Sequence, residues 1–186
     1  MFAKQPTLSY AEYLAYEENS PIKHEFLYGQ AFAMAGASEI HNLIVANLIA
    51  TIRPVLRGTS YRVFPSDMKL SIAAADNATY YPDIMVVCDP TDNNPYVKQQ
   101  PCLLIEVLSP STAAIDRREK LLNYQKLPSL QEYVLVSQTE MQVELFRRDT
   151  NGGWLTKSLS TNETLHLASI DFNISLAEIY EDVIVS

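Results

Sequence analysis

Two acidic residues interrupt apolar stretches that have the character of buried strands. Asp83 follows Pro82 in "YYPDIMVV" (80–87), and Glu106 lies within "CLLIEVLSP" (102–110). A carboxylate in a central strand is costly to bury unless it is paired or binds a metal. Two carboxylates near the ends of successive strands offer the hard oxygen ligands that Mg²⁺ prefers, with room left for waters and a phosphate. The pattern predicts a divalent-cation site suited to phosphodiester hydrolysis.

Each carboxylate also has a purely structural interpretation. Asp83 after Pro82 is typical of a turn residue that starts a strand. Glu106 could form a buried ion pair with a nearby lysine, with no role beyond packing. The sequence leaves both interpretations open.

Apolar periodicity and turn residues predict the elements that would hold these side chains. A short helix is expected over 8–18, a hairpin over 24–35 around Gly29-Gln30, and a long helix from Glu39 to Leu56 with Ser38 as its N-cap. Further strands are expected at 61–72, 80–88, 102–108, 132–136, 142–148 and 154–159, and further helices at 115–126 and 176–180. The alternation indicates a mixed α/β sheet whose core runs helix, three strands, helix, strand. An N-terminal helix-hairpin and a C-terminal hairpin flank that core.

Composition limits the possible classes of protein. The chain has 186 residues, 47% of them apolar, which predicts a single domain (1–186) with a substantial core. Lys and Arg number 14 and Asp and Glu 22, so 14 − 22 gives a net charge of −8. This charge argues against a protein that coats nucleic acid through counterion release alone, but it allows an enzyme with a local basic patch. P-loop, Rossmann and nucleophile-elbow motifs are all missing from the sequence.

The N-terminal segment and the cysteines indicate the compartment. Residues 1–18 contain one lysine and no apolar stretch, so no signal peptide is expected there. Without an apolar run long enough to cross a bilayer, we expect a cytoplasmic protein that makes no membrane contact. Cys88 and Cys102 both lie in apolar runs, and we expect them to be buried free thiols.

Several motifs, in order, resemble a known nuclease superfamily. They are "GASEIHN" (36–42), "FPSDMKL" (64–70), "YPDIMVV" (81–87), "LLIEVLSPST" (103–112) and "DRREKLLNYQ" (116–125). Together they resemble the PD-(D/E)XK nucleases and, more narrowly and over nearly the whole chain, the Uma2 family of endonucleases (DUF820). The resemblance implies a restriction-endonuclease-like fold and a metal-dependent hydrolase that cuts nucleic acid.

One position departs from the superfamily pattern. A lysine normally stands two residues after the glutamate, on the same face of the strand, but Leu108 occupies that position here. The resemblance implies a migrated lysine, for which Lys120 is the first candidate because it shares a helix stripe with Asp116. Lys69 is the second candidate. The simpler alternative is that Asp116 and Lys120 form an ordinary i, i+4 pair on a solvated helix face.

The resemblance assigns a role to each candidate residue. Asp83, Glu106 and the Val107 carbonyl would hold Mg²⁺ or Mn²⁺. Lys120 would orient the attacking water or stabilise charge in the transition state. His41, at the start of the first core helix, would complete the site. Possible outer contacts are Asp67, Lys69 and Asp116.

The expected partners are nucleic acid, with DNA favoured and RNA left open, and a second copy of the chain docked through the apolar N-terminal helix-hairpin. Arginines gather in three places and could follow a phosphate backbone, although scattered solvated arginines explain the same pattern: Arg53, Arg57 and Arg62; Arg117 and Arg118; Arg147 and Arg148. Two other functions remain open. Leu108 and the acidic charge favour an inactive nuclease-fold binding module, and a metal-dependent hydrolase of another substrate is also possible.

Overall fold

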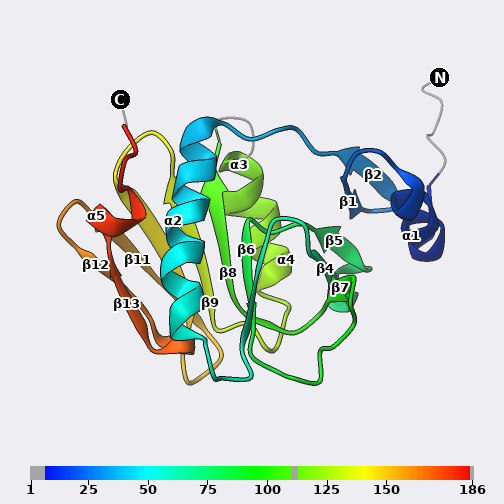
Figure 1. The fold of residues 1–186 in the computed structure, drawn as a ribbon. Helices are drawn as coiled ribbons and strands as arrows, with labels where there is room; N and C mark the ends of the chain where they lie inside the picture. The colour runs from blue at the N-terminus through cyan, green and yellow to red at the C-terminus, as the bar shows by residue number, and fades with distance from the viewer. Residues whose placement is uncertain (1–6, 110–112, 185–186) are drawn as a thin grey trace.

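The strands form two sheets and a separate hairpin (Figure 1) in the computed structural model, which describes residues 7–109 and 113–184. The five-stranded sheet has the order β2-β1-β5-β4-β7, with β1 (His24–Leu27), β2 (Gln30–Ala33), β4 (Lys69–Ile72), β5 (Ala78–Tyr80) and β7 (Val97–Lys98). The six-stranded sheet has the order β11-β10-β9-β8-β6-β3, with β3 (Arg62–Pro65), β6 (Ile84–Val87), β8 (Pro101–Leu108), β9 (Glu132–Ser137), β10 (Gln142–Arg148) and β11 (Trp154–Ser160). The hairpin is β12 (Thr164–Leu167) with β13 (Phe172–Ser175).

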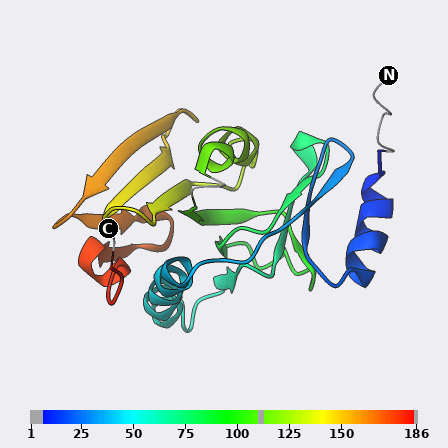
Figure 2. The same ribbon diagram turned by 90° about the horizontal axis from the view of Figure 1, so that it is seen from above.

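Helices cover both faces of the six-stranded sheet, as Figure 2 shows from above. Helix α2 (Glu39–Val55), the β12–β13 hairpin and α5 (Leu176–Ile179) pack on one face. The other face carries α3 (Ala113–Ile115), a π-helical turn (Asp116–Lys120) and α4 (Leu121–Tyr124). Helix α1 (Tyr10–Asn19) packs on β1 through Tyr13 and Phe26, whose ring centroids lie 4.6 Å apart. We call α1, β1 and β2 the N-terminal unit. Two 3₁₀ turns, Ala73–Ala75 and Ala168–Ile170, complete the elements.

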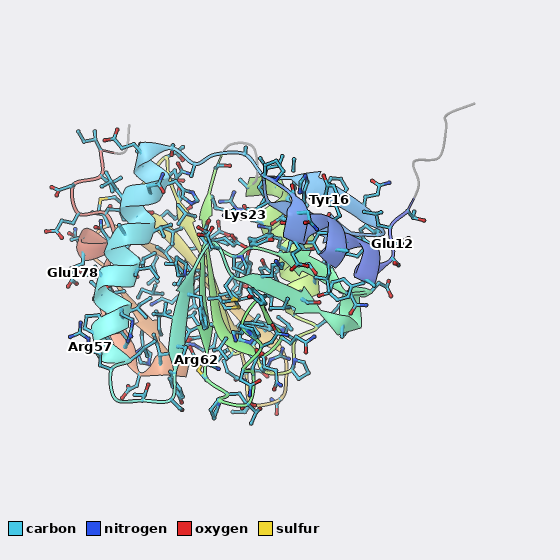
Figure 3. The ribbon with its side chains drawn as sticks, turned by 45° about the vertical axis from the view of Figure 1, so that its right-hand side comes forward. Glu12, Tyr16, Lys23, Arg57, Arg62 and Glu178 are labelled. Atoms are coloured by element: carbon cyan, nitrogen blue, oxygen red, sulfur yellow. A yellow bond between two sulfur atoms is a disulfide. The ribbon has the colours of Figure 1, made fainter. Side chains whose placement is uncertain are left out.

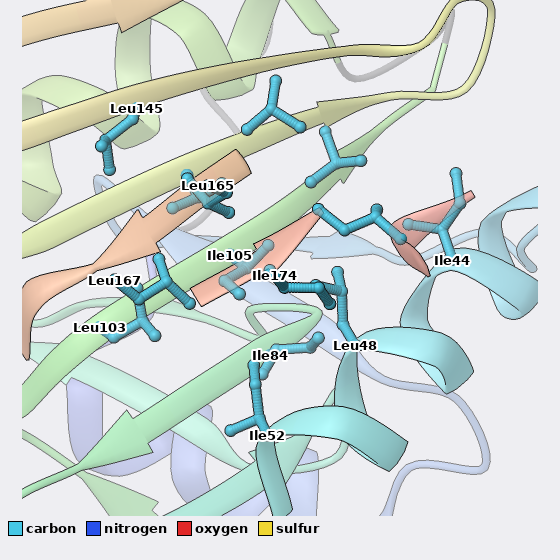
Figure 4. Packing of buried hydrophobic residues seen from close by; sticks show 14 of the residues in the cluster. Ile44, Leu48, Ile52, Ile84, Leu103, Ile105, Leu145, Leu165, Leu167 and Ile174 are labelled. Carbon is cyan, nitrogen blue, oxygen red and sulfur yellow. The ribbon is translucent and has the colours of Figure 1, made fainter. Parts of the chain in front are cut away.

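Strand β8 lies at the centre of the structure and every one of its residues is buried. Leu103 and Ile105 face α2, where they meet Leu48 and Ile52 (Figure 4). Leu104 and Leu108 face the other way, toward α4 and the five-stranded sheet. A strand covered on both faces has a continuous apolar run, which is why the sequence around Glu106 shows no alternation.

The mixed α/β architecture and the core order of helix, three strands, helix and strand are confirmed as α2, β3, β6, β8, the α3–α4 region and β9. Strands β8 and β9 are parallel, while β3, β6 and β8 are antiparallel. The expected pairing of 142–148 with 154–159 is also found, as β10 and β11 within the larger sheet. The sequence interpretation missed β7 and the β12–β13 hairpin, and the motif residues 110–112 lie outside the described residues.

Two expected strands are each broken in two, so the expectations over 61–72 and 80–88 were wrong. The first divides into β3 and β4 at a turn in which the Asp67 N–H donates to the Pro65 carbonyl at 2.7 Å. The second divides into β5 and β6 at Tyr81-Pro82-Asp83, where Pro82 has no N–H to donate to a ladder. Both breaks carry the chain from one sheet to the other. Asp83 therefore lies at the junction between the sheets.

The expectation of free thiols was also wrong. Cys88 and Cys102 form a disulfide, with Cα atoms 5.8 Å apart. Cys88 directly follows β6 and Cys102 lies in β8, at a register shift of the antiparallel β6–β8 pair. The pairing depends on these strands being neighbours, which the local apolar pattern around each cysteine cannot show.

None of the helices in 7–109 and 113–184 is long and apolar enough to cross a membrane.

The disulfide should contribute measurably to stability. It links residues separated by 14 positions, and closing a loop of about that length stabilises a fold by about 3 kcal/mol. We expect reduction to lower the free energy of unfolding by about 2–3 kcal/mol in urea titrations with and without a phosphine reductant. The double variant Cys88→Ser with Cys102→Ser is the control and should not respond to reductant. Alkylation of both cysteines in denaturant without reductant would contradict the bond.

Candidate active site

Asp83 and Glu106 are joined by reciprocal contacts to each other's backbone. The Val107 N–H donates to Asp83 Oδ2 at 2.7 Å, and the Asp83 N–H donates to Glu106 Oε2 at 3.4 Å. Glu106 is 3% exposed, and the Asp83 side chain is 15% exposed. Each carboxylate thus accepts a hydrogen bond from a backbone N–H of the other segment, at the junction between the sheets. The geometry brings together the two side chains that the sequence singled out.

Lys120 contacts Glu106 from the π-helical turn, which packs on the face of β8 opposite to α2. Its Nζ lies 3.2 Å from Glu106 Oε1 and 3.2 Å from Asp116 Oδ1. Asp116 and Lys120 are only 2% and 6% exposed, so the solvated-face alternative for this pair is excluded. Lys120 thus places an ammonium group against Glu106, while Leu108 occupies the position two residues after it.

A π-helical turn places Asp116 and Lys120 on the inward side of the helix. The expected continuous helix over 115–126 instead contains the five-residue π turn Asp116–Lys120 and ends as α4 at Tyr124. Tyr133 on β9 donates its hydroxyl to the Asp116 carbonyl at 3.2 Å. Single π turns inside α-helices occur frequently at functional sites.

A third carboxylate on Lys120 comes from the N-terminal unit, and the sequence interpretation missed it. Glu25 Oε1 lies 3.2 Å from Lys120 Nζ, and its side chain is 17% exposed. In the β1–β5 pair Phe26 lies opposite Thr79, so Glu25 is level with Tyr80. An acidic residue in a short hairpin has no distinctive local signal, because its partner lies 95 positions away in the chain.

Tyr124 was also missed. Its buried hydroxyl donates to Glu106 Oε1 at 2.7 Å, so this oxygen accepts from both Tyr124 and Lys120. Asn123, on the same helix, instead donates to the Tyr80 hydroxyl at 2.7 Å. The Tyr124 ring packs edge-on against Tyr80 and Tyr133. Its hydroxyl therefore holds the Glu106 carboxylate in a fixed position.

His41 lies where the sequence placed it, at the start of α2. Its Nε2 is 3.1 Å from Asp83 Oδ1, and its backbone N–H donates to the N-cap hydroxyl of Ser38 at 3.1 Å. The cap fixes the first turn of the helix and so fixes the position of the imidazole. Asp83 therefore has contacts from α2 on one oxygen and from β8 on the other.

Asp67 and Lys69 are not in contact with the carboxylate pair. The Asp67 side chain is 86% exposed and lies 2.5 Å from Lys23 Nζ. The Lys69 Nζ lies over the Tyr81 ring, 5.7 Å from its centroid. Of the two lysine candidates, the structure brings Lys120 to the carboxylates.

The site carries more negative than positive charge. We call Glu25, Asp83, Glu106 and Asp116 the carboxylate cluster, and Lys120 is the cation in contact with three of them. Burial raises the pKa of Glu106 to about 8, Asp83 and Asp116 add to this effect, and Lys120 opposes it. Burial alone would lower the pKa of Lys120, but the carboxylates around it raise this pKa well above its usual value. Lys120 is therefore a permanent ammonium, and a further cation would be favoured at the cluster.

The donor set fits a hard divalent ion of the magnesium type. Asp83 and Glu106 supply carboxylate oxygens, and Mg²⁺ commonly takes one or two such ligands while keeping several waters. Among the described residues, no group of three or more His, Cys, Asp or Glu side chains is arranged to hold a metal.

A family model matches most of the chain, including every residue of the carboxylate cluster. The Uma2 family model, described as "Putative restriction endonuclease", matches residues 10–177. The chain belongs to the Uma2 family. That range spans the N-terminal unit, both sheets and every member of the carboxylate cluster. Membership in Uma2 supports a nuclease-like function.

Two relatives and one solved structure are similar to the chain over most of its length. The chain is 39% identical to the Synechocystis protein slr1290 over 94% of this chain and 92% of the relative. It is 37% identical to sll1609 of the same organism, over 82% of this chain and 87% of the relative. The crystal structure of a "putative nuclease belonging to DUF820" from Anabaena variabilis superposes with a TM-score of 0.76 at 17% identity, covering 96% of this chain and 99% of the other. The structural likeness shows that the fold is shared.

The raised pKa of Glu106 predicts how stability depends on pH when divalent ions are absent. Between about 4.5 and 8 the folded protein holds a proton on Glu106 that the unfolded chain releases, so the free energy of unfolding falls as pH rises through this window. Glu106→Gln should remove this contribution, and its stability should decline less steeply than that of the wild type. Urea titrations in EDTA at several pH values measure the slopes. Asp67→Asn, at an exposed carboxylate, is the control, and equal slopes for Glu106→Gln and wild type would contradict the pKa shift.

Proposed function

We propose that this Uma2 protein is a Mg²⁺- or Mn²⁺-dependent endonuclease that hydrolyses phosphodiester bonds of DNA. The observation that carries the proposal is the convergence of Asp83, Glu106 and Lys120 at one point. The three come from a strand junction, a central strand and a π turn, and Lys120 compensates in space for Leu108. A pair of carboxylates beside a fixed ammonium is suited to binding a cation and a phosphate together.

In this proposal Asp83, Glu106 and the Val107 carbonyl hold the ion. When bound, the ion lowers the pKa of a water molecule and offsets charge on the scissile phosphate. Hydrolysis forms one bond from the water oxygen to phosphorus and breaks the bond to the leaving sugar oxygen, which takes up a proton.

The chain's own residues act by position and charge. Lys120 remains an ammonium, so it orients water or stabilises negative charge on the phosphate and does not act as a base. Tyr124 holds the Glu106 carboxylate in place, and His41 holds that of Asp83. Fixed donors and charges of this kind need little rearrangement during the reaction.

Replacing the central residues should separate this function from its alternatives. We expect Asp83→Asn, Glu106→Gln and Lys120→Gln to lower the rate of DNA cleavage by about 10²-fold or more, because each removes a charge at the reacting phosphate. The two carboxylate variants should also lose Mn²⁺ binding in calorimetry, whereas Asp67→Asn should retain both properties.

The alternatives predict different results in the same experiments. DNA binding without cleavage, unchanged in Lys120→Gln, would identify an inactive binding module. Metal binding that needs Asp83 and Glu106, with no affinity for DNA or RNA at low salt, would identify a hydrolase of another substrate. Wild-type protein that takes up no Mn²⁺, with or without an oligonucleotide, would overturn the catalytic proposal.

We also propose that the protein acts as a homodimer through the N-terminal unit. One active site cuts one strand, so a double-strand cut needs two sites. The unit and the segment beside it expose Ile22 (53%), Tyr28 (72%) and Phe32 (46%), more apolar side chain than a solvated hairpin needs.

Sedimentation velocity tests the dimer. The wild type should sediment as a dimer, and Tyr28→Glu combined with Phe32→Glu should sediment as a monomer, because charges cannot be buried in an apolar interface without partners. Leu155→Glu, at an exposed apolar residue of β11, is the matched control and should remain dimeric. A wild type that is monomeric at micromolar concentration would contradict the proposal.

A further inference from the structure

Two lysines from distant segments of the chain approach the ring of Tyr81, which lies two residues before Asp83. Lys23 Nζ is 5.6 Å and Lys69 Nζ is 5.7 Å from the centroid of Tyr81. Lys23 directly precedes β1 and Lys69 begins β4, and these strands are the two neighbours of β5 in the five-stranded sheet. Tyr81 directly follows β5, so the two lysines near its ring belong to the two segments of the chain that flank β5.

We propose that Lys23 and Lys69 form a phosphate-binding rim that holds the sugar-phosphate backbone of nucleic acid beside Asp83. We call these two residues the lysine rim. The inference rests on the proposed nuclease function and adds the residues that bind the substrate. Phosphate contacts of this kind position a nucleic acid without reading its sequence.

The ring beneath the lysine rim is firmly held. Tyr81 is 3% exposed, and its hydroxyl donates to Glu17 Oε1 at 2.6 Å. Glu17 in turn accepts from the backbone N–H of His24 at 2.9 Å and lies 3.0 Å from its Nδ1. This network ties α1, β1 and the Pro82 turn together. The ring that both lysines approach is therefore fixed relative to Asp83.

Both ammonium groups are available to an incoming phosphate. Among the described residues, Lys69 has no carboxylate within ion-pair distance. Lys23, with 40% of its side chain exposed, donates to the Ser66 carbonyl at 3.2 Å and pairs with Asp67, whose side chain is 86% exposed. Ion pairs this exposed contribute less than about 1 kcal/mol, so a phosphate can take the place of Asp67.

The carboxylate cluster makes such a rim necessary. Even when Glu106 holds a proton, the three other carboxylates of the cluster outweigh the one ammonium and repel a phosphodiester, and the whole chain has a net charge of −8. Local cations must therefore offset this repulsion at the place where the backbone passes the site.

Most other described cations are committed elsewhere. Arg117 pairs with Glu144 and Arg147 with Glu132, while Arg62 and Arg148 donate to backbone carbonyls. Lys98 is buried against carbonyls, Lys126 donates to Asn123, and Lys157 lies on β11. In Figure 3 Arg57 and Arg62 lie in the lower part of the view, whereas Lys23 lies in the upper part. Arg57 follows His41 by 16 positions along and just beyond α2, a distance of roughly 24 Å.

Salt dependence of binding provides the test. The probe is a fluorescein-labelled DNA duplex, and anisotropy is measured over about 50–200 mM salt in an Asp83→Asn background that does not cleave. Lys23→Gln and Lys69→Gln should each reduce the slope of log K against log salt by about 0.9, and the double variant by about 1.8. Asp67→Asn should tighten binding, because it frees Lys23. Lys157→Gln, on β11, is the matched control and should leave the slope unchanged.

Catalysis gives a second readout on the otherwise wild-type protein. The lysine-rim variants should raise KM and leave kcat nearly unchanged, since the rim binds the backbone and takes no part in the bond change. If both lysine variants cleave DNA with an unchanged KM, and the salt dependence of binding is also unchanged, the rim is overturned and the nuclease proposal stands. A wild type that neither binds nor cuts nucleic acid would overturn both. Circular dichroism of each variant checks that a weakened response does not come from unfolding.

Discussion

The Lys120 ammonium and its three carboxylate partners organise the structure. Glu25 comes from β1, Glu106 from β8 and Asp116 from the π turn, and each lies 3.2 Å from Lys120 Nζ. Buried carboxylates without a cation are strongly destabilising, so the three elements must meet where the ammonium is. Asp116 and Lys120, four positions apart in the π turn, both lie on the buried side of the helix. The position of the N-terminal unit is tied to the site in the same way.

The second constraint is the break at Pro82, which places Asp83 between two sheets. A regular strand would bury Asp83 within the ladder, where its backbone would pair with neighbouring strands. Instead its carboxylate accepts the Val107 N–H, and its N–H contacts Glu106. Backbone groups left unpaired by the break are thus satisfied by the residues that carry the proposed chemistry. The same local geometry serves the fold and the site.

Residue type and short-range pattern were enough to predict part of this arrangement. Asp83 and Glu106 were recognisable because carboxylates are rare in apolar strands, and α2 was recognisable from its N-cap and apolar stripe. Lys120 needed the family resemblance, since an i, i+4 pair with Asp116 looks like any solvated helix surface.

What the sequence could not show depends on contacts between distant segments. Glu25, Tyr124 and the Cys88–Cys102 bond each depend on which strands and helices are neighbours. The division of 61–72 and 80–88 into four strands also depends on two sheets competing for the same segments. Local propensity favours an extended chain over most of 61–72 and 80–88. It does not indicate to which sheet each of the four strands belongs.

The charge distribution links metal and substrate in the proposed function. The carboxylate cluster outweighs the Lys120 ammonium in charge, so it favours a cation and disfavours a phosphodiester. A bound metal ion should therefore improve the site for the phosphodiester, and a bound phosphodiester should improve it for the metal ion. Linkage makes this effect reciprocal: whatever factor the metal adds to the affinity for the backbone, the backbone adds to the affinity for the metal. The acidic remainder of the surface weakens binding away from the site, because non-specific affinity for DNA comes mainly from phosphate neutralisation. An acidic chain with a small lysine rim would therefore bind nucleic acid weakly until the cation is in place, which confines tight binding to the complex that is competent for hydrolysis.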